Sequence, residues 1–251
     1  MDNRRGWLTR MRRWALVCLG LLGLIAVLGL GKAIAQDAPS LPPLSAYPLP
    51  DALVAWSPDS QDDYFDEITP IEGIGYLVWP DRPVQVYVEP PTDLNDRSQV
   101  WSQLVQGAVH DWSLYFPLAL TTQLEDANIA IWRDTPSIQW EANQSPRARS
   151  AETRYRIFVD SPDDATSCLR HQMTLIIRPG QSDQHIAGAT RHELGHALGL
   201  WGHSPLETDA LYYSQVRNPP PISVRDVNTL KRLYEQPTRL GWPLVRSPSI
   251  P

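Results

Sequence analysis

The twelve residues HELGHALGLWGH, from His192 to His203, constrain this chain more than any other stretch. His192 and His196 are four residues apart, so on an α-helix their imidazoles project from one face and can bind one ion. Glu193 occupies the position of the general base in zinc peptidases. Gly199 permits a sharp turn shortly before His203. Because catalytic zinc takes three protein ligands and one open position, this segment alone could supply a complete site.

The segment resembles the metzincin metallopeptidases, most closely the matrixin (matrix metalloproteinase-like) branch, whose pattern is H-E-x-x-H-x-x-G-x-x-H. The first four fixed positions of that pattern are matched by His192, Glu193, His196 and Gly199. Gly202 stands where the third histidine is expected, and His203 follows one residue later, an insertion that a glycine-containing turn tolerates. The alternative third ligand is a carboxylate, from Glu207 or Asp209, which would give a His, His, acid site.

The resemblance also assigns roles to residues after the motif. Leu211 aligns with the methionine beneath the zinc of this family, and leucine is a nearly volume-conserving replacement for it. Tyr213 aligns with the tyrosine that helps to stabilise the oxyanion in the astacin and serralysin branches. We therefore take Tyr213 as a candidate catalytic residue, the alternative being an aromatic side chain in the wall of the cleft.

The first 35 residues are typical of a targeting segment. Five arginines precede an apolar run over residues 14–30, and Ala33-Ile34-Ala35 has the form of a signal peptidase site. The run is long for a signal peptide and nearly long enough to span a bilayer, so cleavage and retention as a membrane anchor both stay open. We expect an exported protein, periplasmic or extracellular, that meets a membrane only through this segment.

The charge of the remaining chain excludes one class of partner. The whole chain has a net charge of −6, and residues 1–35 hold six basic residues and one acid, so the remainder carries −11. Such an acidic domain argues against nucleic acid as a partner and favours solubility in an extracytoplasmic space. The partner implied by the resemblance is a peptide or protein substrate. Cys168 is the only cysteine after residue 35, which excludes an intramolecular disulfide there. Its surroundings lack the matrixin latency motif, which favours a bystander thiol.

Composition divides the chain into four parts. They are the targeting segment 1–35, a Pro-rich linker 36–67 expected to form a semi-rigid tether, one domain over 68–241, and an irregular tail 242–251. Within the domain, strands are expected at 76–79, 84–88, 128–132, 155–159 and 173–177. Helices are expected at 97–116, from 182 or 183 to 200, and at 224–234 after a Ser223 cap.

This order of elements is similar to the matrixin catalytic domain over residues 75–234. It predicts an α+β fold of the metzincin-like zincin type, with a twisted mixed sheet, a long helix, an active-site helix and a C-terminal helix. The second, structural zinc of matrixins is not expected, because His171 and His185 lack the required spacing. We expect both histidines at the surface. Three acids could coordinate Ca²⁺ with loop carbonyls, but a polar turn is the favoured interpretation of this cluster: Asp160, Asp163 and Asp164.

The motif predicts a zinc-dependent endopeptidase. The three histidines bind Zn²⁺, a water takes the fourth position, and Glu193 accepts the water's proton during attack on the peptide carbonyl. The alternative is an exported zinc-binding protein with a degenerate, non-catalytic site, and a weaker one is a membrane-linked adaptor. The sequence leaves the substrate and the oligomeric state open.

Overall fold

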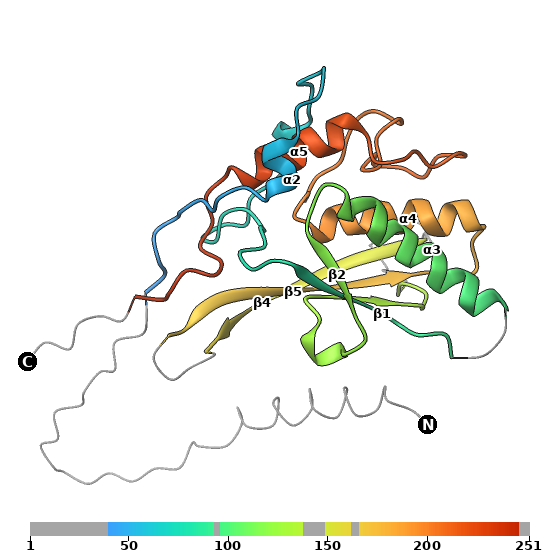
Figure 1. The fold of residues 1–251 in the computed structure, drawn as a ribbon, viewed down its shortest axis with the longest axis horizontal. Helices are drawn as coiled ribbons and strands as arrows, with labels where there is room; N and C mark the ends of the chain where they lie inside the picture. The colour runs from blue at the N-terminus through green and yellow to red at the C-terminus, as the bar shows by residue number, and fades with distance from the viewer. Residues whose placement is uncertain (1–39, 93–95, 138–148, 162–165, 246–251) are drawn as a thin grey trace, which may run out of the picture. The chain divides into compact units, whose positions relative to one another are not determined.

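A mixed five-stranded sheet forms the centre of the fold (Figure 1). The computed structural model describes residues 40–92, 96–137, 149–161 and 166–245. The strands are β1 (Val84–Val88), β2 (Leu118–Thr121), β3 (Ile129–Trp132), β4 (Ala151–Asp160) and β5 (Cys168–Ile177). Their order is β2-β1-β3-β5-β4; the first four are parallel and β4 is antiparallel to β5. The expected α+β class and mixed sheet are confirmed, whereas β2 was not anticipated.

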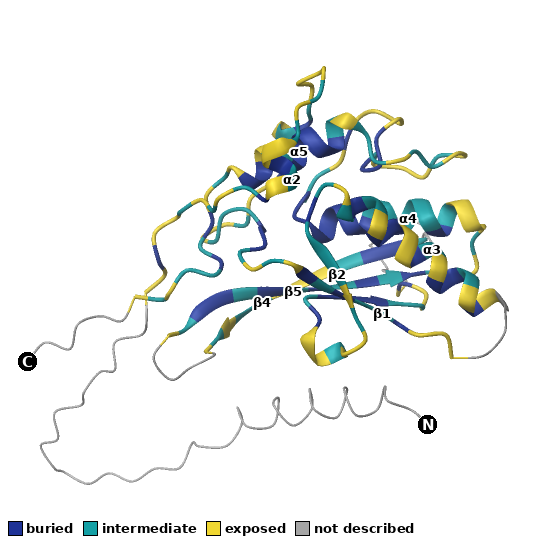
Figure 2. Cartoon of the chain, in the orientation of Figure 1, coloured by how far each residue is buried: buried dark blue, intermediate teal, exposed yellow. Residues whose placement is uncertain are grey.

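Two helices cover one face of this sheet, α3 (Asp96–Ser113) and α4 (Asp183–Ala197), and they lie side by side (Figure 1). Trp101, Val105 and Trp112 of α3 are buried, as the helical spacing of its apolar residues predicts. The Trp112 indole also donates a hydrogen bond to the Arg191 carbonyl oxygen of α4, at 2.8 Å. Figure 2 shows the buried residues gathered where these helices face the sheet. Contacts with α3 therefore help to hold α4, the motif helix, against the sheet.

The motif helix ends earlier than the sequence suggested. Helix α4 begins after Ser182, as expected, but it ends at Ala197 and not at Leu200. Gly199 has φ +107°, and a Cβ there would lie 2.1 Å from the carbonyl oxygen of Leu77. The chain thus needs glycine both for its left-handed conformation and for the close approach of a neighbouring backbone. This turn leads the chain from the helix towards His203.

The C-terminal helix α5 (Val224–Tyr234) begins after Ser223, as expected, and the structure shows that Ser223 and Asp226 form a capping box. The Ser223 hydroxyl accepts a hydrogen bond from the Asp226 backbone N–H, and the Asp226 carboxylate accepts one from the Ser223 N–H. The apolar side of the helix is buried in the core through Val227, Leu230 and Leu233. Asp226 is also fully buried, which a surface capping residue would not be.

The Pro-rich segment does not behave as an unpacked tether over its described part, residues 40–67. Its short helix α2 (Asp51–Ala55) buries Leu53 completely, and Tyr64, just before the 3-10 turn η1 (Phe65–Glu67), is also buried. Trp56 donates a hydrogen bond to the Asn228 side chain of α5, and Figure 1 shows α2 beside this helix. Proline content did not reveal that apolar residues between the prolines reach the core.

Two further expectations are corrected. His171 is only 4% exposed, because it follows the buried alternation of β5 and stacks on Trp79 with ring centroids 3.7 Å apart. The expected strand over 76–79 joins no strand of the described sheet, although residues 77–79 are buried. The Trp79 backbone N–H donates to the Tyr234 hydroxyl and its indole N–H to the Ala197 carbonyl. In both cases tertiary packing, and not the local sequence pattern, decided the burial and the hydrogen bonding of the residues.

Some predictions fall outside the described residues. They are the targeting segment with its anchor at 14–30 and, in the acidic cluster, Asp163 and Asp164; Asp160 forms an ion pair with Arg170 at 2.8 Å. Within the described ranges, no helix combines the length and apolar character needed to cross a membrane. The 3-10 turn η2 (Leu124–Asp126) completes the elements.

Candidate metal centre

Three histidines of the motif converge. His192 and His196 project from α4, and their Nε2 atoms lie 3.1 Å apart. His203 comes from the loop after the helix, and one nitrogen from each ring lies within 4.8 Å of the others. Four-coordinate zinc at Zn–N distances of about 2.0–2.1 Å places its ligand nitrogens about 3.3 Å apart. The geometry therefore suits one metal ion, and this is the only such group of side chains among the residues that the structure describes.

The backbone fixes which nitrogen of each helical histidine faces the centre. Nδ1 of His192 lies 2.9 Å from the carbonyl oxygen of Ala210, and Nδ1 of His196 lies 2.7 Å from that of Leu200. A carbonyl oxygen only accepts hydrogen bonds, so each Nδ1 carries the proton and each Nε2 is left with a lone pair. Two lone pairs then face each other across 3.1 Å, which is unfavourable unless a cation lies beside them.

The surroundings of His196 and His203 favour their neutral form, which metal binding requires. Burial lowers the pKa of His196 well below its usual value, and the neighbouring His192 and His203 lower it further. Burial of its ring, followed by the electrostatic interaction with the neighbouring His192, lowers the pKa of His203 to about 4. Both imidazoles are therefore unprotonated near neutral pH.

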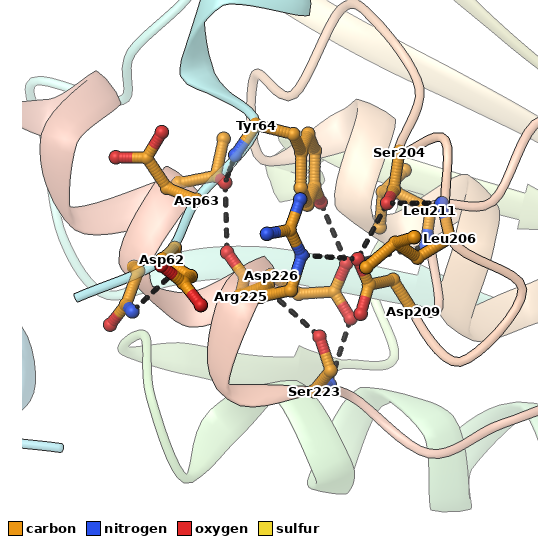
Figure 3. A network of polar contacts seen from close by, with 12 residues as sticks. Asp62, Asp63, Tyr64, Ser204, Leu206, Asp209, Leu211, Ser223, Arg225 and Asp226 are labelled. Carbon is orange, nitrogen blue, oxygen red and sulfur yellow. Dashed lines mark hydrogen bonds and ion pairs between the residues drawn. The ribbon is translucent and has the colours of Figure 1, made fainter. Parts of the chain in front are cut away.

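The acidic alternatives for the third ligand are placed elsewhere. Asp209 is 1% exposed, accepts a hydrogen bond from Ser204 at 2.5 Å and forms an ion pair with Arg225 at 3.0 Å, as Figure 3 shows. Glu207 is exposed, and neither acid belongs to the group of side chains around the two helical histidines. Among the sequence candidates, His203 is the residue that the fold brings to this centre.

The candidate base, Glu193, is buried next to the histidines. Its Oε2 accepts a hydrogen bond of 2.6 Å from the Thr153 hydroxyl on β4. Burial raises the pKa of Glu193, and this effect is opposed by His192 and by the Thr153 hydrogen bond. A carboxylate with a raised pKa is a better proton acceptor than an exposed one.

A cavity of about 170 Å³ opens beside the centre. His192 and Glu193 line it, together with Tyr213, whose side chain is 66% exposed. The fold thus brings the tyrosine suggested by the resemblance to the same cavity, on a wall that is accessible to solvent. No contact between its hydroxyl and the three histidines is seen in the described structure.

Leu211 lies directly against the motif helix. It is fully buried, and a Cβ on Gly195 would come within 2.5 Å of its Cδ2 atom. Gly195 stands between the two helical histidines in sequence, so Leu211 packs beneath the part of α4 that carries them. The apolar floor expected at this position is therefore present, with leucine as the packing group.

Sequence reasoning missed two residues of this site, Thr153 and Asp226. Thr153 lies on a strand 40 residues from Glu193, and nothing in its local pattern indicates the contact. Asp226 was recognisable only as a helix-capping residue, although its carboxylate also accepts hydrogen bonds from the Ala210 and Leu211 backbone.

Comparison with known proteins yields no matching family model and no match to a curated protein sequence. The interpretation of this centre accordingly depends on its own geometry.

Proposed function

We propose that this chain is a zinc-dependent endopeptidase in which His192, His196 and His203 hold the ion. One observation carries the proposal: the Nε2 atoms of His192 and His196 lie 3.1 Å apart, each with its Nδ1 against a backbone carbonyl, and Glu193 of the same motif is buried. A bound zinc ion supplies Lewis acidity, polarising a carbonyl and lowering the pKa of a coordinated water to about 7. A purely structural zinc site usually uses four protein ligands and needs no neighbouring base.

Glu193 acts as the general base in this proposal. Thr153 holds Oε2, and among the described residues no donor is bonded to Oε1. Oε1 therefore takes the proton from the water as the water oxygen attacks the peptide carbonyl carbon. The same carboxyl group then delivers the proton to the amine that leaves as the C–N bond breaks. Tyr213 is proposed to donate a hydrogen bond to the developing oxyanion after a rotation of its exposed side chain.

The sheet edge beside the centre favours a peptide substrate. In the described sheet β4 has one strand neighbour, β5, and Thr153 on β4 contacts Glu193. Extended peptides bind to free strand edges through backbone hydrogen bonds. A peptide laid along β4 would bring one of its carbonyl groups towards the histidines.

We also propose that the domain has the metzincin-like fold and that the protein is exported. The supports for the fold are the order of the helices and strands and the packing of Leu211 under the motif helix. The support for export is the basic, apolar character of residues 1–35 followed by an acidic domain. The peptide or protein substrate would then be met outside the cytoplasm.

The competing function is an exported zinc-binding protein without catalysis. It is favoured by one observation, the exposed position of His203, whose nitrogen lies up to 4.8 Å from those of the other two rings. The two functions differ in what Glu193 does, because a binding protein has no use for a buried base.

The test uses the purified protein and a library of unstructured peptides. We expect about one zinc ion per chain by elemental analysis, and cleavage that a chelator abolishes and added zinc restores. Glu193→Gln should retain zinc and lose hydrolysis by 10²-fold or more, within the range of about 10²–10⁴ for general acid–base groups. Full activity of this variant would overturn the role of the base, and a zinc-loaded wild type without cleavage would establish the competing function.

A further inference from the structure

The N-terminal segment 64–69 contacts the backbone that carries His203. The Thr69 N–H donates a hydrogen bond of 3.0 Å to the carbonyl oxygen of Trp201. A Cβ on Gly202 would lie 2.0 Å from the carbonyl oxygen of Glu67, so the two backbones touch at this point. Any side chain at Gly202 would push this loop away from the segment. The next residue is His203, whose position is therefore set by residues 67–69.

The same segment is also connected, through Asp226 of α5, to the backbone that hydrogen-bonds to His192. The Tyr64 hydroxyl donates a hydrogen bond of 2.6 Å to Oδ1 of Asp226, and both residues are buried (Figure 3). Asp226 in turn accepts hydrogen bonds from the Ala210 N–H at 2.8 Å and the Leu211 N–H at 3.3 Å. The carbonyl oxygen of Ala210 is the group that accepts from Nδ1 of His192.

One peptide unit thus connects Asp226 to the metal ligand. In the peptide unit between Ala210 and Leu211, the carbonyl oxygen accepts a hydrogen bond from His192 and the N–H donates one to Asp226. Hydrogen bonds in such a chain polarise one another, which makes the imidazole a better ligand. The Tyr64 hydroxyl donates to Oδ1 of Asp226, the same oxygen that accepts from the Leu211 N–H.

We infer that residues 64–69 position two of the three metal ligands, His192 through Asp226 and His203 through the Trp201–Gly202 backbone. The inference rests on the proposed metal site and extends it to a segment that spans the boundary, at residues 67 and 68, between the Pro-rich linker and the domain that composition defines. These residues touch no reacting atom, so they are positioning residues. Outer partners of this kind typically change metal affinity by 10–100-fold when they are lost.

The test compares variants in the full chain. Tyr64→Phe removes one hydroxyl and keeps the ring, and Gly202→Ala adds one methyl group against Glu67. Trp56→Phe is the matched control, because it removes a partly buried hydrogen bond to Asn228 of α5 from a residue of the Pro-rich linker outside 64–69, without touching either connection. The measurements are the zinc dissociation constant by chelator competition, the visible absorption spectrum of the Co²⁺-loaded protein, and the melting temperature without metal.

We expect Tyr64→Phe to weaken zinc binding about 10-fold and Gly202→Ala 10–100-fold, both with an altered Co²⁺ spectrum. Trp56→Phe should lower the melting temperature while the zinc constant stays within about twofold of wild type. Unchanged zinc constants in both variants, or an equal loss in Trp56→Phe, would overturn the inference. A wild type that binds zinc without cleaving peptides would refute the peptidase alone, whereas a wild type without zinc affinity would refute both.

Discussion

The Thr153 hydroxyl lies 2.6 Å from Oε2 of Glu193 and 3.0 Å from the Glu193 carbonyl oxygen. One side chain of β4 therefore fixes both the carboxylate and the backbone of the candidate base. Because β4 is antiparallel to β5 and lies at the end of the described sheet order, the contact also links the base to the edge proposed to bind peptide. The Thr153 hydroxyl thus connects β4 to the motif helix α4 at the candidate base.

Removing that hydroxyl should change the pH profile of hydrolysis. The hydrogen bond from Thr153 lowers the pKa of Glu193, so Thr153→Val raises this pKa. We expect the acid limb of kcat/KM to move to higher pH by about one unit, because hydrogen bonds to charged groups contribute about 1.5–3 kcal/mol and one pKa unit corresponds to about 1.4 kcal/mol. Thr153→Ser keeps a hydroxyl and should keep the wild-type profile; a superimposable Thr153→Val profile would contradict the assignment.

The third ligand can be identified by metal affinity. His203→Ala should weaken zinc binding by more than about 100-fold, since even partners outside the coordination sphere contribute 10–100-fold. Glu207→Gln, a change at an exposed acid four residues later, should leave the constant unchanged. Chelator competition measures both. A large loss in Glu207→Gln with none in His203→Ala would transfer the role to the carboxylate.

The packing of Leu211 predicts which substitutions its position tolerates. Leu211→Ala should lower the free energy of unfolding by about 2–5 kcal/mol, because it leaves a cavity under the motif helix. Leu211→Met keeps the volume and should cost less than about 1.5 kcal/mol. Denaturant unfolding at neutral pH checks the pair, and equal effects of both changes would show that Leu211 does not form the floor.

His171 should make the fold sensitive to acid. Burial lowers the pKa of His171 to about 3, while in the unfolded chain it is the ordinary 6.5, so between these values the unfolded state binds more protons. Its contribution to stability is complete above about pH 6.5 and is lost as the pH falls towards 3. From pH 7 to pH 5 the loss is about 2 kcal/mol.

His171→Phe removes this titration and keeps a ring against Trp79. Between pH 7 and pH 5 the variant should therefore lose about 2 kcal/mol less than wild type in chemical denaturation with a chelator present. Parallel pH dependence of the two proteins would show that His171 is protonated in the folded state.

The sequence alone determined the parts of the fold that depend on short-range periodicity. Strands β1 and β3 and helices α3 and α5 lie within a few residues of their predicted bounds. The spacing of His192 and His196 placed both rings on one helix face, because an α-helix repeats every 3.6 residues. These features need no knowledge of distant residues.

Tertiary structure decided everything that joins segments far apart in the chain. It brought Thr153 to Glu193, buried Asp226 behind the Ala210–Leu211 backbone and left Asp209 paired with Arg225. It also packed Tyr64 and Leu53 of the Pro-rich segment into the core. The physical reason is that such contacts depend on which surfaces meet once the sheet and helices have assembled, and no local pattern of residues encodes that meeting.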